Sequence, residues 1–346
     1  MRIARRGASL IVVLLGLACS ESGSENSVTS PAPSIRSSSE SKVDGDAKTK
    51  FHSSNYADWV GKAHNKGLDD LFAALNDGQH GNMCAEIEDM FSKPGHMPAD
   101  QDKLTTGQRR VSVNAGLAIT KLCAGLYATD GTIAVTLASR AAGASTNMLS
   151  ASANNLLSQI DYASYSSTTA GVLAASLNNV LTQANALPSA ERDVIYAVSS
   201  VAQYSYEYWA VNLTPLDDQV RTVYGNCLVQ YSDQTTAINV CVGIPRPMPT
   251  DYDGWREAPL ISFASAGLVS AMICNSPDPR EVRHTDVQGG VGGALLGWAT
   301  ATAPGILAGA FLGAVAGSGA EALWQVSSHV WCRLRGGSEP LKKSTT

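Results

Sequence analysis

His64 and Asn65 form the polar pair most suggestive of chemistry in this sequence. His64 shares helical spacing with Val60 and Leu68, so we expect its imidazole to be at least partly buried. A buried imidazole needs a hydrogen-bond partner, either a backbone carbonyl or a carboxylate from elsewhere in the chain. We therefore interpret His64 and Asn65 as a candidate polar site and favour a structural role for the histidine over catalysis.

Catalysis at His64 would require the imidazole to line an open cleft with a carboxylate nearby. The sequence contains no nucleophile elbow, zinc-protease motif or phosphate-binding loop in a strand-to-helix setting. We therefore predict that the chain is not an enzyme and needs no cofactor. A hydrolase that uses His64 is the third of three functional hypotheses.

The remaining polar clusters do not form a convincing metal site. His80 and Cys84 lie one helical turn apart and His96 follows, but a fourth ligand is not visible, so we predict no bound metal. The adjacent carboxylates Asp69–Asp70 and Asp217–Asp218 would point in different directions on a helix. We expect both pairs to lie on solvated faces.

Helical elements must position these side chains. The recurrence of Val60, Leu68 and Leu71 predicts a helix that begins at Ser53 or Ser54 and stops before Gly78. Residues 107–210 predict three or four amphipathic helices, residues 216–230 predict another, and residues 275–286 indicate a loop. Because no sustained strand alternation occurs, we predict an all-α multi-helix bundle over residues 51–285.

A charge-free stretch from Val287 to Ala320 follows this bundle, and Pro304 divides it into two helical arms. Neither arm reliably reaches the ~20 apolar residues of a membrane-spanning helix. We therefore predict a glycine-rich helical hairpin over residues 286–335 and a flexible tail at 336–346. The hairpin glycines recur at helical spacing and comprise Gly293 and Gly297 in the first arm and Gly305, Gly309, Gly313 and Gly317 in the second.

Residues four apart share one helix face, so these glycines would form a smooth groove that a second backbone can approach closely. Each glycine costs roughly 1 kcal/mol relative to alanine in a helix, so close contact must compensate. The hairpin could pack within the protein core, insert into a membrane, or bind a protein partner or a second copy of the chain. Leucine at Gly309 and Gly313 would overpack a core but would be tolerated on a surface that faces lipid.

The first residues of the chain predict export. Residues 1–18 combine a basic start with an apolar segment too short to span a bilayer stably, as in a signal peptide. The stretch from Leu15 to Cys19 resembles the lipobox of bacterial lipoproteins, although Gly16 occupies a position where that family usually has leucine. The resemblance implies a lipid attached to Cys19, and Ser20 after it implies the outer membrane. The alternative is an ordinary signal-peptide cleavage site beside an unmodified Cys19, which would give a secreted protein without a lipid anchor.

Six further cysteines support an oxidising compartment. An even number in an exported chain predicts three disulfides, whose connectivity the sequence leaves open. A bond between Cys274 and Cys332, which flank the hairpin, would tie its base to the preceding element and favour packing within the protein. The six candidates are Cys84, Cys123, Cys227, Cys241, Cys274 and Cys332.

The serine-rich residues 19–50 lack an apolar run, so we predict a disordered tether that spans roughly 30 Å. The chain carries 25 basic and 30 acidic residues, and removal of the three signal-peptide arginines lowers its net charge from −5 to about −8. This balance disfavours nucleic acid as a partner. The expected partners are the membrane, through the lipid anchor, and a protein bound through the hairpin.

Two motifs carry a further resemblance. The glycine- and alanine-rich run that begins TDVQGGVGGALLG resembles the glycine-zipper tails of bacteriocin-like secreted proteins. The segment NYADWVGKAHNKGLD (55–69) resembles a motif of secreted bacterial proteins that end in such tails and have no assigned activity. The resemblance implies a helical, exported protein. Our first hypothesis is a lipid-anchored cell-envelope protein with an interaction or structural role, and our second is a membrane-active protein whose hairpin inserts into lipid.

Overall fold

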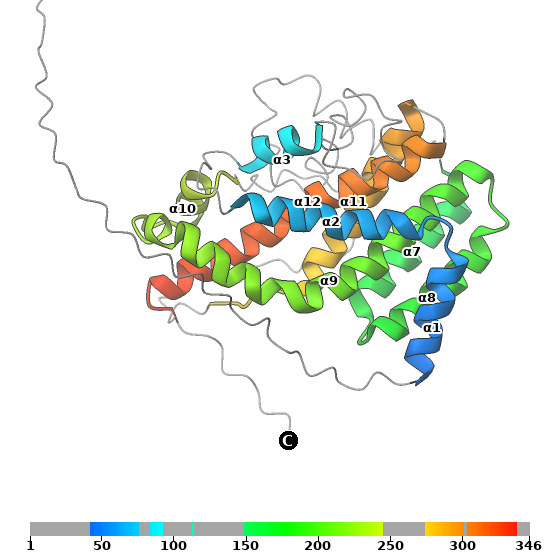
Figure 1. Ribbon diagram of the computed structural model, residues 1–346, viewed down its shortest axis with the longest axis horizontal. Helices are drawn as coiled ribbons and strands as arrows, with labels where there is room; N and C mark the ends of the chain where they lie inside the picture. The colour runs from blue at the N-terminus through cyan, green and yellow to red at the C-terminus, as the bar shows by residue number, and fades with distance from the viewer. Residues whose placement is uncertain are drawn as a thin grey trace, which may run out of the picture. The chain divides into compact units, whose positions relative to one another are not determined.

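The computed structural model describes residues 42–75, 83–92, 113, 149–244, 274–300 and 303–337. Within these residues the chain is all-α, with nine helices and no strand, which confirms the predicted fold class. The helices are α1 (Lys42–Ser54), α2 (Asp58–Ala74), α3 (Met83–Ser92), α7 (Ala151–Ser166), α8 (Ala170–Ala184), α9 (Ser189–Leu228), α10 (Gln234–Cys241), α11 (Pro279–Thr300) and α12 (Ala303–Leu334). Figure 1 shows their arrangement.

The long helix α9 is the scaffold against which α2, α11 and α12 pack. At 1.5 Å per residue its 40 residues extend about 60 Å. The separate helix expected over residues 216–230 is wrong, because α9 continues through Pro215. Proline costs a helix one hydrogen bond, but here buried Leu213 and Leu216 anchor the chain on either side. The residue four positions before the proline, Val211, is half-exposed, so water can reach its freed carbonyl.

The expected helical hairpin forms, but it begins earlier than the sequence indicated. α11 starts at Pro279, within the stretch interpreted as a loop, and the predicted boundary at residue 286 therefore falls inside a helix. A proline suits the first turn of a helix because that turn leaves its backbone N–H groups unbonded. The break between α11 and α12 lies just before Pro304, as expected.

The hairpin is part of the core of the bundle. α11 and α12 pack most extensively against each other, and both also pack against α9. The segment Gly305–Leu334 is long and apolar enough to cross a membrane, yet 89% of its most apolar stretch of 18 residues is buried within the protein. Fully buried side chains such as Phe311, Leu312 and Leu323 account for this enclosure.

Helix α1 corrects the predicted extent of the tether. Residues 42–50 belong to a helix that packs against α8, whereas residues 19–41 lie outside the described part of the chain. Phe51 is fully buried, and Asn178 Nδ2 donates a hydrogen bond to the Ala47 carbonyl at 3.0 Å. Packing against a distant helix thus orders a segment whose composition alone predicted disorder.

The chain turns at Asn55 between α1 and α2, where the sequence predicted the start of a single helix. Asn55 Oδ1 accepts from the Ala57 N–H at 2.9 Å, while its Nδ2 donates to the Tyr196 carbonyl at 3.0 Å. The second bond joins the turn to α9. It thereby fixes where α2 begins, and so where His64 lies.

Candidate functional site

The candidate polar site at His64 lies in the interior of the bundle. The inner face of α2 carries Val60, His64, Leu68 and Leu71, all of them buried as the helical spacing predicted. The imidazole of His64 has no exposed surface. α9 and α12 pack over this face and enclose it.

Asp286 of α11 is the carboxylate partner of His64. His64 Nε2 lies 2.7 Å from Asp286 Oδ1, and both side chains are completely buried. The second oxygen, Oδ2, accepts from the Trp209 indole N–H at 2.7 Å and from the Ser205 hydroxyl. Three hydrogen bonds therefore compensate the buried carboxylate for its lost hydration.

Asn65 orients the imidazole from the other side. Its Oδ1 lies 2.9 Å from His64 Nδ1, and its Nδ2 donates to the Tyr204 carbonyl at 3.2 Å. With acceptors opposite both ring nitrogens, the imidazole is suited to carry two protons. The predicted pair thus acts as a unit that links α2 to α9.

The charged form of His64 is favoured. Burial alone would lower the pKa of His64, but the Asp286 charge and the hydrogen bonds to Asp286 and Asn65 together raise it above its ordinary value. The site is therefore a buried ion pair that joins α2 to α11. Such a pair is strongly sensitive to the removal of either partner, because the remaining charge would be buried alone.

This geometry differs from that of a catalytic triad. Ser318 lies near the pair, with its Oγ 3.5 Å from His64 Nε2, but its hydroxyl donates to the Ala314 carbonyl at 3.1 Å. In a triad the carboxylate and the serine bind opposite ring nitrogens, whereas here both face Nε2. A carboxylate does lie beside His64, but the imidazole is enclosed rather than lining an open cleft. Of the two conditions set for a hydrolase, only one is met.

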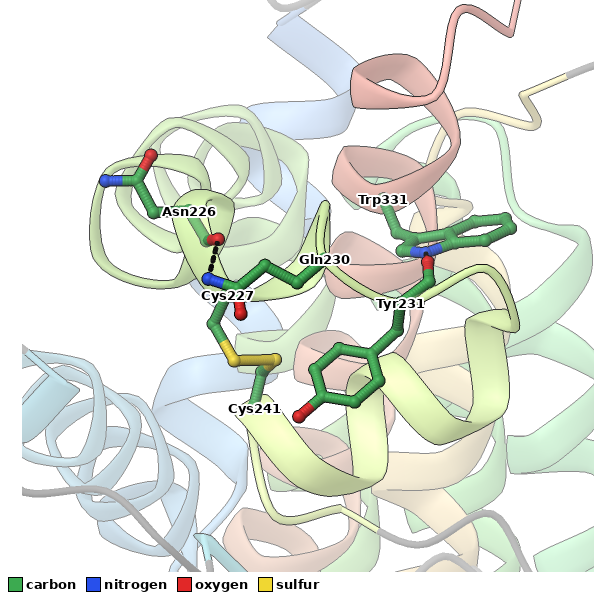
Figure 2. Close-up of a disulfide and its surroundings, with 6 residues drawn as sticks. All are labelled: Asn226, Cys227, Gln230, Tyr231, Cys241 and Trp331. Carbon is green, nitrogen blue, oxygen red and sulfur yellow. Dashed lines mark hydrogen bonds between the residues drawn. A yellow bond between two sulfur atoms is a disulfide. The ribbon is translucent and has the colours of Figure 1, made fainter.

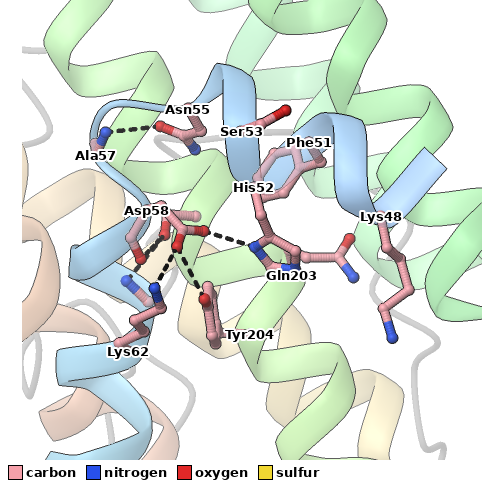
Figure 3. Close-up of polar contacts among 12 residues, drawn as sticks. Lys48, Phe51, His52, Ser53, Asn55, Ala57, Asp58, Lys62, Gln203 and Tyr204 are labelled. Carbon is pink, nitrogen blue, oxygen red and sulfur yellow. Dashed lines mark hydrogen bonds and ion pairs between the residues drawn. The ribbon is translucent and has the colours of Figure 1, made fainter. Parts of the chain in front are cut away.

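A second polar cluster surrounds Asp58 at the start of α2, and the sequence analysis missed it (Figure 3). Its carboxylate lies 2.6 Å from His52 Nδ1 and 2.9 Å from Lys62 Nζ, and it accepts from the Tyr204 hydroxyl at 3.0 Å. Partial burial opposes ionisation, but these three hydrogen bonds prevail and lower the pKa of Asp58. The i,i+4 spacing of Asp58 and Lys62 was the available sequence signal.

Close packing accompanies this cluster. Ser200 Oγ accepts from the Gly61 N–H at 2.9 Å and donates to the Asp58 carbonyl at 3.0 Å. A Cβ added at Gly61 would overlap the Tyr204 ring and lie 2.6 Å from the Ser200 carbonyl oxygen. Gly61 therefore allows α2 and α9 to approach each other.

Each of the four histidines in the described residues faces an aspartate of another helix. His284 Nδ1 lies 2.6 Å from Asp161, which joins α11 to α7. His329 Nδ1 lies 2.7 Å from Asp217, which joins α12 to α9. Together with the pairs at His52 and His64, these contacts involve six helices, namely α1, α2, α7, α9, α11 and α12. Interhelical pairing is thus the common role of histidine in this part of the chain.

The adjacent carboxylates differ in exposure, since Asp69 and Asp218 are exposed whereas Asp70 and Asp217 are partly buried. Asp69 accepts from the Tyr208 hydroxyl at 2.9 Å while remaining exposed, whereas the partly buried Asp217 turns inward to face His329. The other members form surface ion pairs, Asp70 with Lys66 and Asp218 with Arg221. The expectation of solvated faces therefore holds for the exposed Asp69 and fails for Asp217, which faces the buried His329. Within the described residues, no group of three His, Cys, Asp or Glu side chains could hold a metal ion.

The hairpin glycines meet one another across the α11–α12 contact. A Cβ at Gly293 would overlap the Gly309 carbonyl, 2.8 Å from its carbon, and one at Gly313 would lie 2.9 Å from the Gly293 Cα. A Cβ at Gly297 would lie 2.5 Å from the Gly305 carbonyl carbon. The glycine repeat thus lies at successive points where the antiparallel helices α11 and α12 come into backbone contact. Gly317 is also buried on α12.

Two disulfides fasten the ends of these helices. Cys227–Cys241 joins the end of α9 to α10, beside Trp331, whose indole N–H donates to the Tyr231 carbonyl at 3.0 Å (Figure 2). Cys274–Cys332 joins the segment before α11 to the end of α12 and so closes the base of the hairpin. Cys84 is also disulfide-bonded, whereas Cys123 and Cys19 lie outside the described residues.

The earliest signal for the Asp286 contact was present in the sequence but was not used. Asp286 is the last charge before the charge-free stretch and lies seven residues before Gly293, on the same helix face. A carboxylate on the buried face of a helix requires a partner.

Comparison with protein-family models, with curated proteins and with solved structures found no match to this chain.

Proposed function

We propose that the chain is an exported cell-envelope protein, anchored through lipid on Cys19, with a non-enzymatic interaction or structural role. The observation that carries the structural role, in place of insertion of the hairpin into lipid, is the contact of the hairpin glycines with one another inside the bundle. This contact compensates for the glycine repeat without lipid. The interhelical disulfides are compatible with an oxidising compartment outside the cytoplasm.

The buried polar network supports a structural rather than a catalytic use of His64. Its imidazole has no exposed surface, and its Nε2 lies 2.7 Å from Asp286 Oδ1. A substrate could reach it only if the helices that enclose it, α9 and α12, moved away from α2. The serine-rich tether would hold the bundle away from the membrane surface.

Membrane fractionation of a bacterial host that expresses the full chain tests the anchor. We expect the protein in the membrane fraction and a Cys19→Ser variant in the soluble fraction. Ser20→Ala is the matched control, because it alters the neighbouring residue but leaves the thiol available for lipidation. Equal membrane recovery of the full chain and the Cys19→Ser variant would overturn the anchor.

The second candidate is a membrane-active protein whose hairpin enters lipid, and the apolar length of α12 favours it. Dye leakage from lipid vesicles separates the two candidates. Oxidised protein that begins at Ser20 should leave vesicles intact, because the hairpin is enclosed and the Cys274–Cys332 bond closes its base. The same protein, reduced and thermally unfolded, is the control with an exposed hairpin. Leakage caused by the oxidised, folded protein would favour the membrane-active candidate.

A further inference from the structure

The surface between α7 and α8 carries an open groove of about 460 Å³, which is within the ~300–1,000 Å³ typical of small-molecule sites. The two helices pack against each other, next to α1 (Figure 1). We infer that this groove binds a neutral oligosaccharide. Its polar lining consists of Asn155, Ser158, Gln159 and Tyr162 from α7 and Ser176 and Asn179 from α8.

Helical spacing gathers these side chains into two walls. On α7, Asn155, Gln159 and Tyr162 follow one another at intervals of four and three residues and therefore share one face. On α8, Ser176 and Asn179 are three residues apart and share a face in the same way. Every side chain that provides a polar group to the groove is an amide, a hydroxyl or a phenol.

Among the residues that the structure describes, none that lines the groove carries a formal charge. α8 contains no acidic, basic or histidine residue. The single acidic residue of α7, Asp161, does not line the groove and faces His284 at 2.6 Å. A charged ligand would lose hydration on entering and would find no counter-charge in the lining. The lining therefore selects for a neutral ligand.

The amides offer donors and acceptors together, as sugar hydroxyl groups require. Gln159 Nε2 donates to Asn155 Oδ1 at 2.7 Å, which leaves the Asn155 amide protons and the Gln159 carbonyl oxygen to face a ligand. Asn179 forms no side-chain hydrogen bond within the described residues. Each hydroxyl of a sugar both donates and accepts, so a row of neutral amides matches it without a fixed charge.

Tyr162 supplies the apolar surface that a sugar ring also needs. Its side chain is 71% exposed at the rim of the groove. The flat ring of a tyrosine can cover the C–H face of a pyranose while its hydroxyl remains in water. The buried lining residues Ala163 and Val180 are small and offer no deep apolar pocket for the anchoring side chain of a peptide. These features favour an oligosaccharide over a peptide.

This inference rests on the proposed interaction role and names its ligand class. An exported protein meets envelope polysaccharides, and a tethered domain with such a groove could bind them. Loss of the groove and loss of the anchor remain separate events, because the groove lies on α7 and α8 whereas the anchor requires Cys19.

Titration calorimetry with neutral tetrasaccharides tests the groove. The probes are the tetramers of N-acetylglucosamine, of α-linked glucose and of mannose. The protein is the oxidised full chain in a polyoxyethylene detergent, which carries no sugar headgroup. Tyr162→Ala and Asn179→Ala should each weaken binding by about tenfold, a difference of about 1.4 kcal/mol. Tyr165→Ala is the matched control, because Tyr165 lies on the same helix as Tyr162 but does not line the groove.

Saturable binding of at least one tetramer, weakened by the two groove variants and retained by the control, is the expected result. The absence of saturable binding by folded protein would overturn the inference, as would binding that both groove variants retain. Tighter binding of a galacturonate tetramer or of a neutral peptide would also overturn it. Membrane fractionation is independent of every one of these results, so failure of the groove is distinguishable from failure of the anchor.

Discussion

The replacement of Gly293 by alanine tests the packing of the hairpin most directly. The added methyl would overlap the Gly309 carbonyl and lie 3.0 Å from the Gly313 Cα. Ordinary carbon–carbon contacts are about 3.5–4.0 Å, so the contact with the Gly313 Cα alone would require α11 and α12 to separate by roughly 0.5–1 Å, and the overlap with the Gly309 carbonyl would require more. Backbone atoms on both sides leave no side chain free to move away. We expect overpacking to cost about 1–3 kcal/mol.

Gly290→Ala is the matched control in the same helix. A Cβ at Gly290 would make ordinary contacts, 3.6 Å from the Ala310 carbonyl oxygen and 3.8 Å from the Ala314 Cβ. Both variants gain about 0.5–1 kcal/mol from the lower chain entropy of alanine in the unfolded state. The difference between their free energies of unfolding therefore isolates the overlap at Gly293.

Urea unfolding followed by far-ultraviolet circular dichroism, with the disulfides intact, measures this difference. We expect Gly290→Ala to equal or exceed the parent protein in stability and Gly293→Ala to unfold at a lower urea concentration. Equal stability of the two variants would show that the helices are not in backbone contact at Gly293, which would refute the reasoning on which the packed hairpin depends.

Three further predictions concern the buried ion pair and the disulfides. Asp286→Asn should lower the free energy of unfolding at pH 6 by about 3 kcal/mol in urea titrations. This value is at the lower end of the cost of breaking a buried ion pair, because the imidazolium of His64 can release its proton. A change below ~1 kcal/mol would contradict the charge assigned to His64. The pKa of His64 is raised in the folded state, so the stability that its charge provides is complete below the unfolded pKa of about 6.5 and is lost as the pH rises through the folded pKa. The midpoint temperature of thermal unfolding should therefore decline between pH 6 and pH 9, and Asp286→Asn should abolish this decline. Cys274→Ala with Cys332→Ala should cost about 4 kcal/mol, against about 3 kcal/mol for the shorter loop between α9 and α10, since sequence separations of 58 and 14 set the chain entropy; the reverse order in urea unfolding would argue against this explanation.

Local patterns in the sequence predicted the individual elements well. The spacing of Val60, His64 and Leu68 indicated a buried face, and α2 buries all three. The glycine repeat and Pro304 indicated a hairpin of two close helices, and α11 and α12 form one. These features depend on helical periodicity and on the size of glycine, both of which can be read from neighbouring residues.

Boundaries were less predictable, because contacts from distant helices decide them. Residues 42–50 have the composition of a tether, but packing against α8 makes them helical. Residues 216–230 were predicted to form a separate helix, but α9 continues through Pro215, with buried leucines on both sides. Contacts with α8 together with the burial of the adjacent Phe51 in the first case, and the burial of Leu213 and Leu216 in the second, outweighed a local preference of about 1–3 kcal/mol.

The sequence by itself determined that this chain is helical, that His64 faces inward and that the hairpin glycines share a face. Only the tertiary structure determined that Asp286 is the partner of His64 and that the glycines of α11 meet those of α12. It alone brought the neutral side chains of α7 and α8 to one groove. The physical reason is that periodicity fixes which face of a helix is buried, whereas the choice of what lies opposite depends on chain segments up to 222 residues away.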